Sequence, residues 1–346
     1  THHRQRRRVL AQRQLVALQH ADAVLGRDRT ALGHHGIEHH GVDGRLLVAI
    51  GDVAGHSIHA ATVMVELRHA LRAYAIEHRD FPWRRTRDPY AVLVSEVMLQ
   101  QTPVARVLPM YDRWITMFPV PSALATQPVA TAVREWGRLG YPRRAQRLHA
   151  VSVVLDTEFD DEVPANLELL RGLPGVGEYT AAAVMAFAFA KRSVVVDTNV
   201  RRVLARAVLG QQWPAPHLSR AEMALAESLV PKSDAAASTW SAGVMELGAV
   251  ICTVTKPSCD ECPLASHCAW RQAGYIESPR PTRTQAWHGT DRQCRGAIVQ
   301  MLRDSDSPVA NAQLRTVWDD AEQFKKCLLA LRAEGLVVRT QKGWTL

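Results

Sequence analysis

The chain has 346 residues, of which 47% are hydrophobic, enough for two or three domains with a sizeable core. Its 42 Lys and Arg residues outnumber its 34 Asp and Glu residues, and the isoelectric point near 9.4 favours a polyanionic partner such as nucleic acid. The sequence has no apolar stretch that could cross a bilayer and no signal-peptide core near its start, which excludes membrane and secreted classes. We therefore expect a cytoplasmic protein, associated with the nucleoid if its source is a bacterium.

The N-terminal part differs in character from the rest of the chain. Residues 1–42 are rich in Arg, His and Gln, and we expect a disordered leader. Residues 43–77 run from a strand-like "RLLVAIGDVAGH" into a helical pattern. This stretch resembles one strand-turn-helix unit of the PPM-type serine/threonine phosphatases, in which Asp52 would be a metal ligand. Such enzymes need several distant acidic ligands, and no other segment matches, so we interpret the stretch as a non-functional fused fragment.

The region from residue 78 to 272 predicts a mainly α domain, because apolar residues recur at helical spacing and strand-like alternation is scarce. The predicted helices are 89–101, 104–117, 122–126, 129–138, 142–157, 166–171, 178–190, 199–209, 219–229 and 234–248. Residues 273–291 have the composition of a linker. Residues 292–346 predict three helices and two short strands, an order typical of a small winged-helix module, although a dimerisation or packing unit fits equally well.

Four of the six cysteines lie close together with the spacing C-x6-C-x2-C-x5-C. They are Cys252, Cys259, Cys262 and Cys268. Four thiolates in such a short loop can hold zinc or a 4Fe-4S cluster, and the long first gap favours iron-sulfur over the paired C-x2-C of zinc sites. We expect the centre to be structural. The distant Cys294 and Cys327 are interpreted as ordinary thiols.

The segment "LRGLPGVGEYTAAAVMAFAFA" (170–190) predicts a helix-hairpin-helix. Pro174, Gly175 and Gly177 would form a tight turn whose backbone amides face a phosphate at the start of the next helix. An ordinary helix turn is the alternative interpretation. The sequence L-P-G-V-G before an alanine-rich helix favours binding to the DNA backbone.

Two carboxylates are candidates for acid-base chemistry. Glu96 lies in an otherwise apolar helix, where poor solvation raises a carboxyl pKa and allows proton donation near neutral pH; satisfaction by a core Arg or Tyr is the structural alternative. Asp197 precedes an amphipathic helix, where it would be an N-cap that stays ionised and could face a developing cation. One protonated and one ionised carboxyl group suit the cleavage of a glycosidic bond.

Together these signals resemble the helix-hairpin-helix DNA glycosylase superfamily that contains endonuclease III, and within it the adenine glycosylases of the MutY type. The resemblance covers residues 78 to about 272. It is carried by "RDFPWR" (79–84), "SEVMLQQT" (95–102), "RLGY" (138–141), "LPGVGEYTAAA" (173–183), "VDTNVRRVLAR" (196–206) and the four-cysteine loop.

The resemblance implies a role for each matching residue. Glu96 would protonate the adenine leaving group, and Asp197 would stabilise the sugar cation or its covalent adduct. Gln101 and Tyr141 would wedge into the base stack, because side chains must fill the gap left by a flipped base. The other residues implied at the catalytic site, around the extruded adenine or at the DNA are Tyr179, Asn199, Arg79, Trp83, Arg84, Leu99, Gln100, Thr102, Leu173, Gly175, Val176 and Gly177.

The activity implied is removal of adenine mispaired with 8-oxoguanine or guanine, by hydrolysis of the N-glycosidic bond, in a monomeric protein that binds double-stranded DNA and carries a 4Fe-4S cluster. Lyase-competent relatives have a nucleophilic Lys where this chain has Tyr179, so the resemblance implies base removal with little strand cleavage. Two features depart from the family. Pro142 replaces a second Tyr, and residues 292–346 are too few for the Nudix-like domain that helps to recognise 8-oxoguanine. A thymine-mismatch glycosylase and a non-catalytic DNA-binding fusion are the alternatives.

Overall fold

A computed structural model describes the backbone of residues 37–42 and 45–50 and the whole of residues 79–279 and 287–346. The chain divides into two compact units, residues 1–66 and 67–346. In the first unit, strands β1 (Ile37–Val42) and β2 (Arg45–Ile50) pair in an antiparallel hairpin. The strand expected at the start of the phosphatase-like stretch is therefore present, whereas its expected helix and Asp52 lie outside the described residues.

Within the expected leader, the structure describes residues 37–42. This segment forms β1, in which Ile37 pairs with Ile50 and Val42 with Arg45. Pairing with a neighbouring strand satisfies the backbone amides and carbonyls of a segment whose side-chain composition alone favours disorder. The leader residues before β1 lie outside the described part of the chain.

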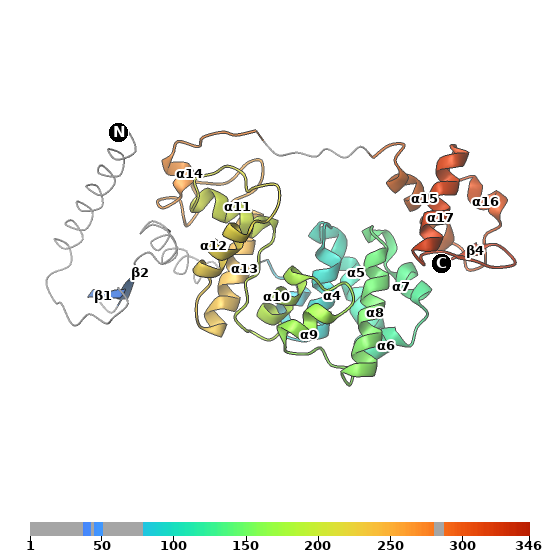
Figure 1. Ribbon diagram of the computed structural model, residues 1–346, viewed down its shortest axis with the longest axis horizontal. Helices are drawn as coiled ribbons and strands as arrows, with labels where there is room; N and C mark the ends of the chain where they lie inside the picture. The colour runs from blue at the N-terminus through green and yellow to red at the C-terminus, as the bar shows by residue number, and fades with distance from the viewer. Residues whose placement is uncertain (1–36, 43–44, 51–78, 280–286) are drawn as a thin grey trace. The chain divides into compact units, whose positions relative to one another are not determined.

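The second unit is mainly helical (Figure 1). Its first elements are α3 (Pro82–Arg85), α4 (Pro89–Leu99), α5 (Val104–Met117), α6 (Pro121–Ala125), α7 (Val129–Glu135), the 3-10 helix η1 (Gly137–Leu139), α8 (Arg143–Glu158) and α9 (Leu167–Gly172). It continues with α10 (Glu178–Phe187), α11 (Thr198–Ala207), α12 (Arg220–Leu229), α13 (Asp234–Val250) and α14 (Ala269–Gln272). Every helix predicted between residues 89 and 248 is present, which confirms the predicted α class for this region.

Helix α4 begins where the sequence signals a start and is then buried along its length. The Asp88 side chain accepts hydrogen bonds from the amides of Tyr90 and Ala91, and Pro89 occupies the first turn, where a missing amide costs nothing. All residues from Tyr90 to Met98 are buried, since α3, α5, α8 and α10 pack around the helix. Any polar side chain on α4 is therefore forced into the interior.

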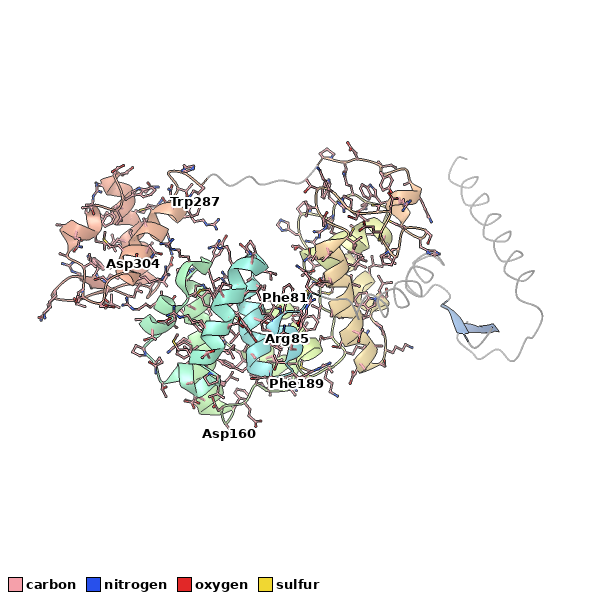
Figure 2. The ribbon with its side chains drawn as sticks, turned by 180° about the vertical axis from the view of Figure 1, so that it is seen from behind. Phe81, Arg85, Asp160, Phe189, Trp287 and Asp304 are labelled. Atoms are coloured by element: carbon pink, nitrogen blue, oxygen red, sulfur yellow. The ribbon has the colours of Figure 1, made fainter. Side chains whose placement is uncertain are left out.

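The helices form two groups. Helix α4 packs against α5, α8 and α10, while α11 packs against α13 and α14. Helix α10 also contacts α13, which joins the groups. Viewed from behind, the segment that carries Phe81 and Arg85 lies where the two groups meet (Figure 2). Catalytic and binding side chains from both groups can thus converge on this boundary.

The C-terminal part has the predicted order of elements: α15 (Asp291–Arg303), α16 (Asn311–Arg315), α17 (Ala321–Ala333), then the antiparallel strands β3 (Val338–Arg339) and β4 (Trp344–Thr345). The start of the expected linker is held by the helical unit. Trp270 Nε1 donates a hydrogen bond to the Ile276 carbonyl at 2.9 Å, and Trp213 Nε1 donates to the Ser278 carbonyl at 3.0 Å. Within the described residues, no helix combines the length and the apolar character needed to span a bilayer.

Candidate active site

Glu96, Tyr179 and Asp197 come together from three helices. Glu96 is buried on α4, Tyr179 lies in the first turn of α10, and Asp197 caps α11. Burial raises the pKa of Glu96 to about 7, a hydrogen bond from the Tyr179 phenol lowers it, and the charge of Asp197 raises it. Burial beside these two carboxyl groups also raises the pKa of Tyr179 well above its ordinary value. The site therefore holds one carboxyl group that is partly protonated at neutral pH.

Asp197 is held rigidly at the start of α11. Its Oδ1 accepts the Val200 amide at 2.7 Å, and its Oδ2 accepts Asn199 Nδ2 at 2.7 Å. The expected N-cap is confirmed, but the expected electrostatic effect is not. Burial raises the pKa of Asp197 and outweighs the hydrogen bonds from Val200 and Asn199, which lower it. The sequence pattern reveals the cap but not how much water the surrounding fold removes.

A third buried carboxylate, missed in the sequence analysis, lies on α13. Glu246 is 2% exposed and accepts hydrogen bonds from Arg79 Nε at 2.6 Å, Arg79 Nη2 at 3.0 Å and Arg84 Nη2 at 2.8 Å. Burial alone would raise its pKa, but the two guanidinium groups lower it below its ordinary value. The signal was available, because Glu246 is a lone acid in the apolar run "GVMELGAV", as Glu96 is in its own helix.

Arg84 connects this ion-pair cluster with Glu96. Its positive charge lowers the pKa of Glu96, and its Nη1 atom is buried with no hydrogen-bond partner among the described residues. A buried guanidinium donor without an acceptor is costly. The arrangement therefore offers a hydrogen bond to a ligand beside the Glu96 carboxyl.

Other residues predicted around an extruded base lie close to α4. Trp83 is buried, with its ring stacked on Phe81 at 5.1 Å and edge-on to Tyr111 at 5.1 Å. Leu99 is partly buried at the end of α4, and Gln100 Nε2 donates to Thr180 Oγ1 at 3.3 Å. Trp83 thus packs within the core. Leu99 is only partly buried, and Gln100 joins the end of α4 to α10.

The expected hairpin lies between α9 and α10. Gly175 has a φ of +75°, a left-handed conformation that favours glycine, and Gly177 is the N-cap of α10. Leu173 and Val176 are buried, so their side chains anchor the turn in the core. What the turn presents outward is backbone: the amides at the start of α10 have no intrahelical partners, which suits a phosphate group.

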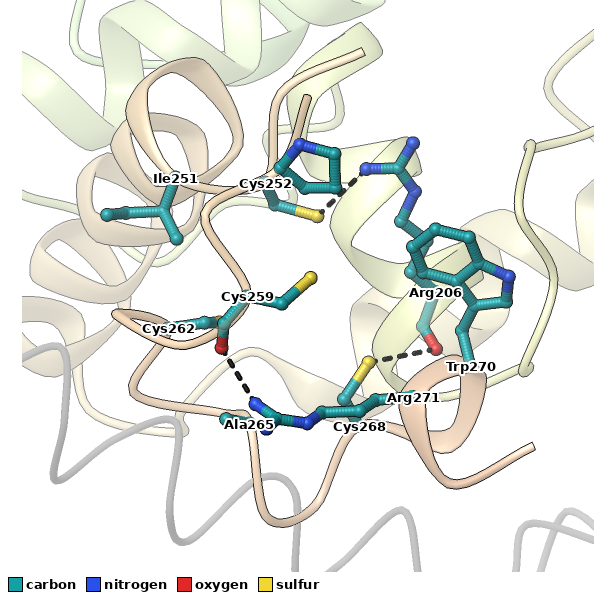
Figure 3. Close-up of a pocket in the computed structure, with 10 residues that line it drawn as sticks. Arg206, Ile251, Cys252, Cys259, Cys262, Ala265, Cys268, Trp270 and Arg271 are labelled. Carbon is teal, nitrogen blue, oxygen red and sulfur yellow. Dashed lines mark hydrogen bonds between the residues drawn. The ribbon is translucent and has the colours of Figure 1, made fainter. Parts of the chain in front are cut away.

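The four clustered cysteines line one pocket, together with Arg206, Ile251, Pro257, Ala265, Trp270 and Arg271. Figure 3 shows the sulfur atoms of Cys252, Cys259 and Cys268 directed toward a common cavity. Arg206 Nη1 lies 3.5 Å from Cys252 Sγ, and Cys268 Sγ lies 3.6 Å from the Arg206 carbonyl oxygen. Among the described residues, no three His, Cys, Asp or Glu side chains are arranged to hold a single metal ion.

Arg202 bridges the cysteine pocket and the catalytic group. Its Nε donates to the Cys252 carbonyl at 2.7 Å, while its Nη2 donates to Asn199 Oδ1 at 2.8 Å and to the Gly248 carbonyl at 2.6 Å. Asn199 in turn binds Asp197. No sequence signal indicates this role, since an arginine in an amphipathic helix is normally solvated.

This fold is similar to that of known DNA-repair proteins. Residues 94–228 match the HhH-GPD superfamily of base excision DNA repair proteins. A solved structure of a thermostable thymine-DNA glycosylase superposes with a TM-score of 0.55 and 30% identity, over 62% of this chain and 97% of that one. A trapped endonuclease III–DNA covalent intermediate shares the fold, with a TM-score of 0.53, 21% identity and coverage of 63% and 99%. The fold and the family match define a helix-hairpin-helix base-excision repair protein.

The family within that class follows from sequence relatives. The adenine DNA glycosylase of Mycolicibacterium smegmatis is 48% identical over 272 residues, which are 78% of this chain and 92% of the relative. The chain therefore belongs to the adenine DNA glycosylase family. The model of a second family, stage II sporulation protein E, matches residues 42–100 and overlaps the phosphatase-like stretch. That match extends past the stretch into α4 and does not identify a phosphatase.

Proposed function

We propose that this protein removes adenine mispaired with 8-oxoguanine or guanine from double-stranded DNA, by hydrolysis of the N-glycosidic bond and without efficient strand cleavage. The observation that carries this proposal is the buried Glu96 carboxyl, with a pKa of about 7, beside Tyr179 and Asp197. Purine release from deoxyribose requires a proton on the leaving base and stabilisation of an oxocarbenium-like sugar. The two carboxyl groups divide these tasks.

Glu96 donates the proton. A general acid works best when its pKa is near the working pH, because a large fraction is then protonated and the group is still acidic enough to transfer the proton. Burial supplies that pKa, and Arg84 and Tyr179 prevent it from rising further. Asp197, fixed by Val200 and Asn199, faces the positive charge that develops on the sugar once the base departs.

The base is held next to Glu96 by donors and acceptors from α3 and α13. Arg84 Nη1 has no described partner and offers a hydrogen bond to a ring nitrogen of adenine. Glu246 is an acceptor for an exocyclic amine, and Arg79 and Arg84 hold its carboxylate in place. Thymine has no exocyclic amine, so this pair of groups favours adenine over the thymine-mismatch alternative.

Tyr179 supports base removal without lyase activity. It lies in the first turn of α10, beside both carboxyl groups, where a nucleophilic lysine would reach the sugar. A phenol cannot form a Schiff base with the opened sugar, so no imine commits the strand to cleavage. The hairpin turn before it supplies backbone amides to the DNA phosphates.

The four cysteines suit a 4Fe-4S cluster. All four cysteines line one cavity. The long first gap of their C-x6-C-x2-C-x5-C spacing favours iron-sulfur over zinc, whose four-cysteine sites are usually built from paired C-x2-C motifs. Cys252, Cys259, Cys262 and Cys268 would hold the cluster, which would stabilise this loop beside Arg202 and Arg206.

The test is a single-turnover assay on duplexes that differ only in the mismatch, A opposite 8-oxoguanine and G opposite T. We expect alkali-labile sites in the first duplex alone, and few breaks without alkali. Glu96→Gln keeps the shape of the side chain but removes its proton, so it should still bind the duplex while excision falls roughly 100-fold to 10,000-fold. Thymine release without adenine release would establish the thymine-mismatch enzyme instead. Tight binding without release of either base would establish a non-catalytic DNA-binding protein.

A further inference from the structure

Two exposed residues on neighbouring loops have unusual backbone conformations. Gln101 follows α4 with a φ of +53°, and Tyr141 follows η1 with a φ of +47°. Both are left-handed conformations that are strained for a non-glycine residue, and they persist only where the surroundings fix them. Tyr141 is 40% exposed although it is a large aromatic residue. The two loops therefore keep the side chains of Gln101 and Tyr141 exposed, in backbone conformations that these residue types normally avoid.

Arg144, on α8, binds both loops from inside the protein. Its Nη1 donates to the carbonyls of Val97, Met98 and Gln100 at 3.0, 2.9 and 2.6 Å. Its Nη2 donates to Thr102 Oγ1 at 2.9 Å and to the carbonyls of Leu139 and Gly140 at 3.2 and 3.1 Å. Nη1 thus holds the backbone that leads into Gln101. Nη2 joins Thr102, which follows Gln101, to Leu139 and Gly140, which precede Tyr141.

This guanidinium is an expensive group to bury. Arg144 is 6% exposed, and in the described part of the chain all six of its acceptors are carbonyl or hydroxyl oxygens and none is a carboxylate. Burial lowers its pKa to about 10, so it remains charged at neutral pH. Three acceptors belong to the last turn of α4 or follow it directly, where unpaired carbonyls carry partial negative charge. The charge is therefore stabilised by the helix that carries Glu96.

We propose that Arg144 is a positioning residue for base extrusion, which sets the spacing of Gln101 and Tyr141 so that both enter the DNA stack when adenine leaves it. The inference rests on the proposed function. Arg144 itself does not touch the DNA or the reacting atoms. A planar fork is required, because its two terminal nitrogens reach the two loops at the same time, whereas the single nitrogen of a lysine ammonium cannot.

The test compares Arg144→Lys with Arg113→Lys, a change at an exposed arginine of α5 that pairs with Glu135. A duplex with 2-aminopurine opposite 8-oxoguanine reports unstacking as a rise in fluorescence and needs no excision. We expect Arg144→Lys to reduce this rise at least threefold and to slow adenine excision at least tenfold. The pH midpoint of excision should stay near 7, since Glu96 is untouched, and Arg113→Lys should match the unchanged protein in every measurement.

A general structural role would give a different result. If Arg144→Lys displaced the pH midpoint, or left the fluorescence rise intact while excision fell, the residue would act on the catalytic site or the whole fold and the inference would be wrong. If Arg144→Lys did not fold, Thr102→Val would decide, because it removes one acceptor of Nη2 and should reduce the fluorescence rise in the same way. A fluorescence response in the unchanged protein without adenine excision would count against the proposed function alone.

Discussion

A single methyl group at Gly248 should disable the site without replacing any catalytic residue. Gly248 lies on α13 against the start of α11, and a Cβ there would lie 2.7 Å from Asn199 Cβ, 2.8 Å from the Asn199 carbonyl oxygen and 2.9 Å from its carbonyl carbon. Ordinary contacts of such an atom are 3.4–4 Å. Two of the three contacts are with backbone, so side-chain rotation cannot relieve them. Gly248→Ala must move the start of α11 away from α13 by roughly 0.5–1 Å.

The size of the effect follows from what α11 carries. Asn199 binds Asp197, and Arg202 binds both Asn199 and the Gly248 carbonyl, so a shift of α11 moves the group that faces the sugar cation. A misplacement near 1 Å costs about 100-fold in rate. Overpacking should lower the free energy of unfolding by about 1–3 kcal/mol. Replacing glycine with alanine in a helix offsets up to about 1 kcal/mol of this loss. We expect a large loss of activity with a small loss of stability.

The assay is single-turnover adenine excision, with thermal unfolding measured alongside. Gly296→Ala is the matched control, because Gly296 is also in a helix and a Cβ there meets nothing within 4 Å. That control should keep the full rate and gain about 0.4–1 kcal/mol of stability. Excision by Gly248→Ala within twofold of the unchanged protein would refute the argument that Asn199 and Asp197 are set by this contact.

Three further outcomes are expected. Excision should be fastest below pH 7 and fall above it, because the proton on Glu96 is lost there. The folded carboxyl keeps this proton to about pH 7, while the unfolded one loses it near pH 4.5, so the free energy of unfolding should fall by roughly 3 kcal/mol as the pH rises between these values. Glu96→Gln should abolish this loss when melting is measured as a function of pH. Borohydride should trap almost no unchanged protein on DNA, whereas Tyr179→Lys should yield trapped complex and nicked strands; efficient trapping of the unchanged protein would mean that another amine reaches the sugar. Purified protein should be yellow-brown with broad absorption near the blue edge of the visible range, and an active, colourless, zinc-loaded protein would disprove the cluster assignment.

The sequence by itself determined the local structure and the chemical class of the site. Helical periodicity located the helices from 89 to 250, because each buries one or more apolar faces whatever its neighbours are. Glu96 was recognisable as a perturbed acid because its own helix is apolar, and Gly175 as a turn residue because few other residues adopt its backbone conformation. These properties are set by residues within a few positions along the chain.

Only the tertiary structure decided which charges meet. Arg79 lies 167 residues before Glu246, and nothing near either residue indicates the other as its partner. The six acceptors of Arg144 belong to two loops and one helix end, and the direction of the Asp197 pKa depends on how much water the surrounding elements remove. A charge buried between helices is stabilised by groups from several elements, so its partners, its pKa and its role emerge only when those elements pack together.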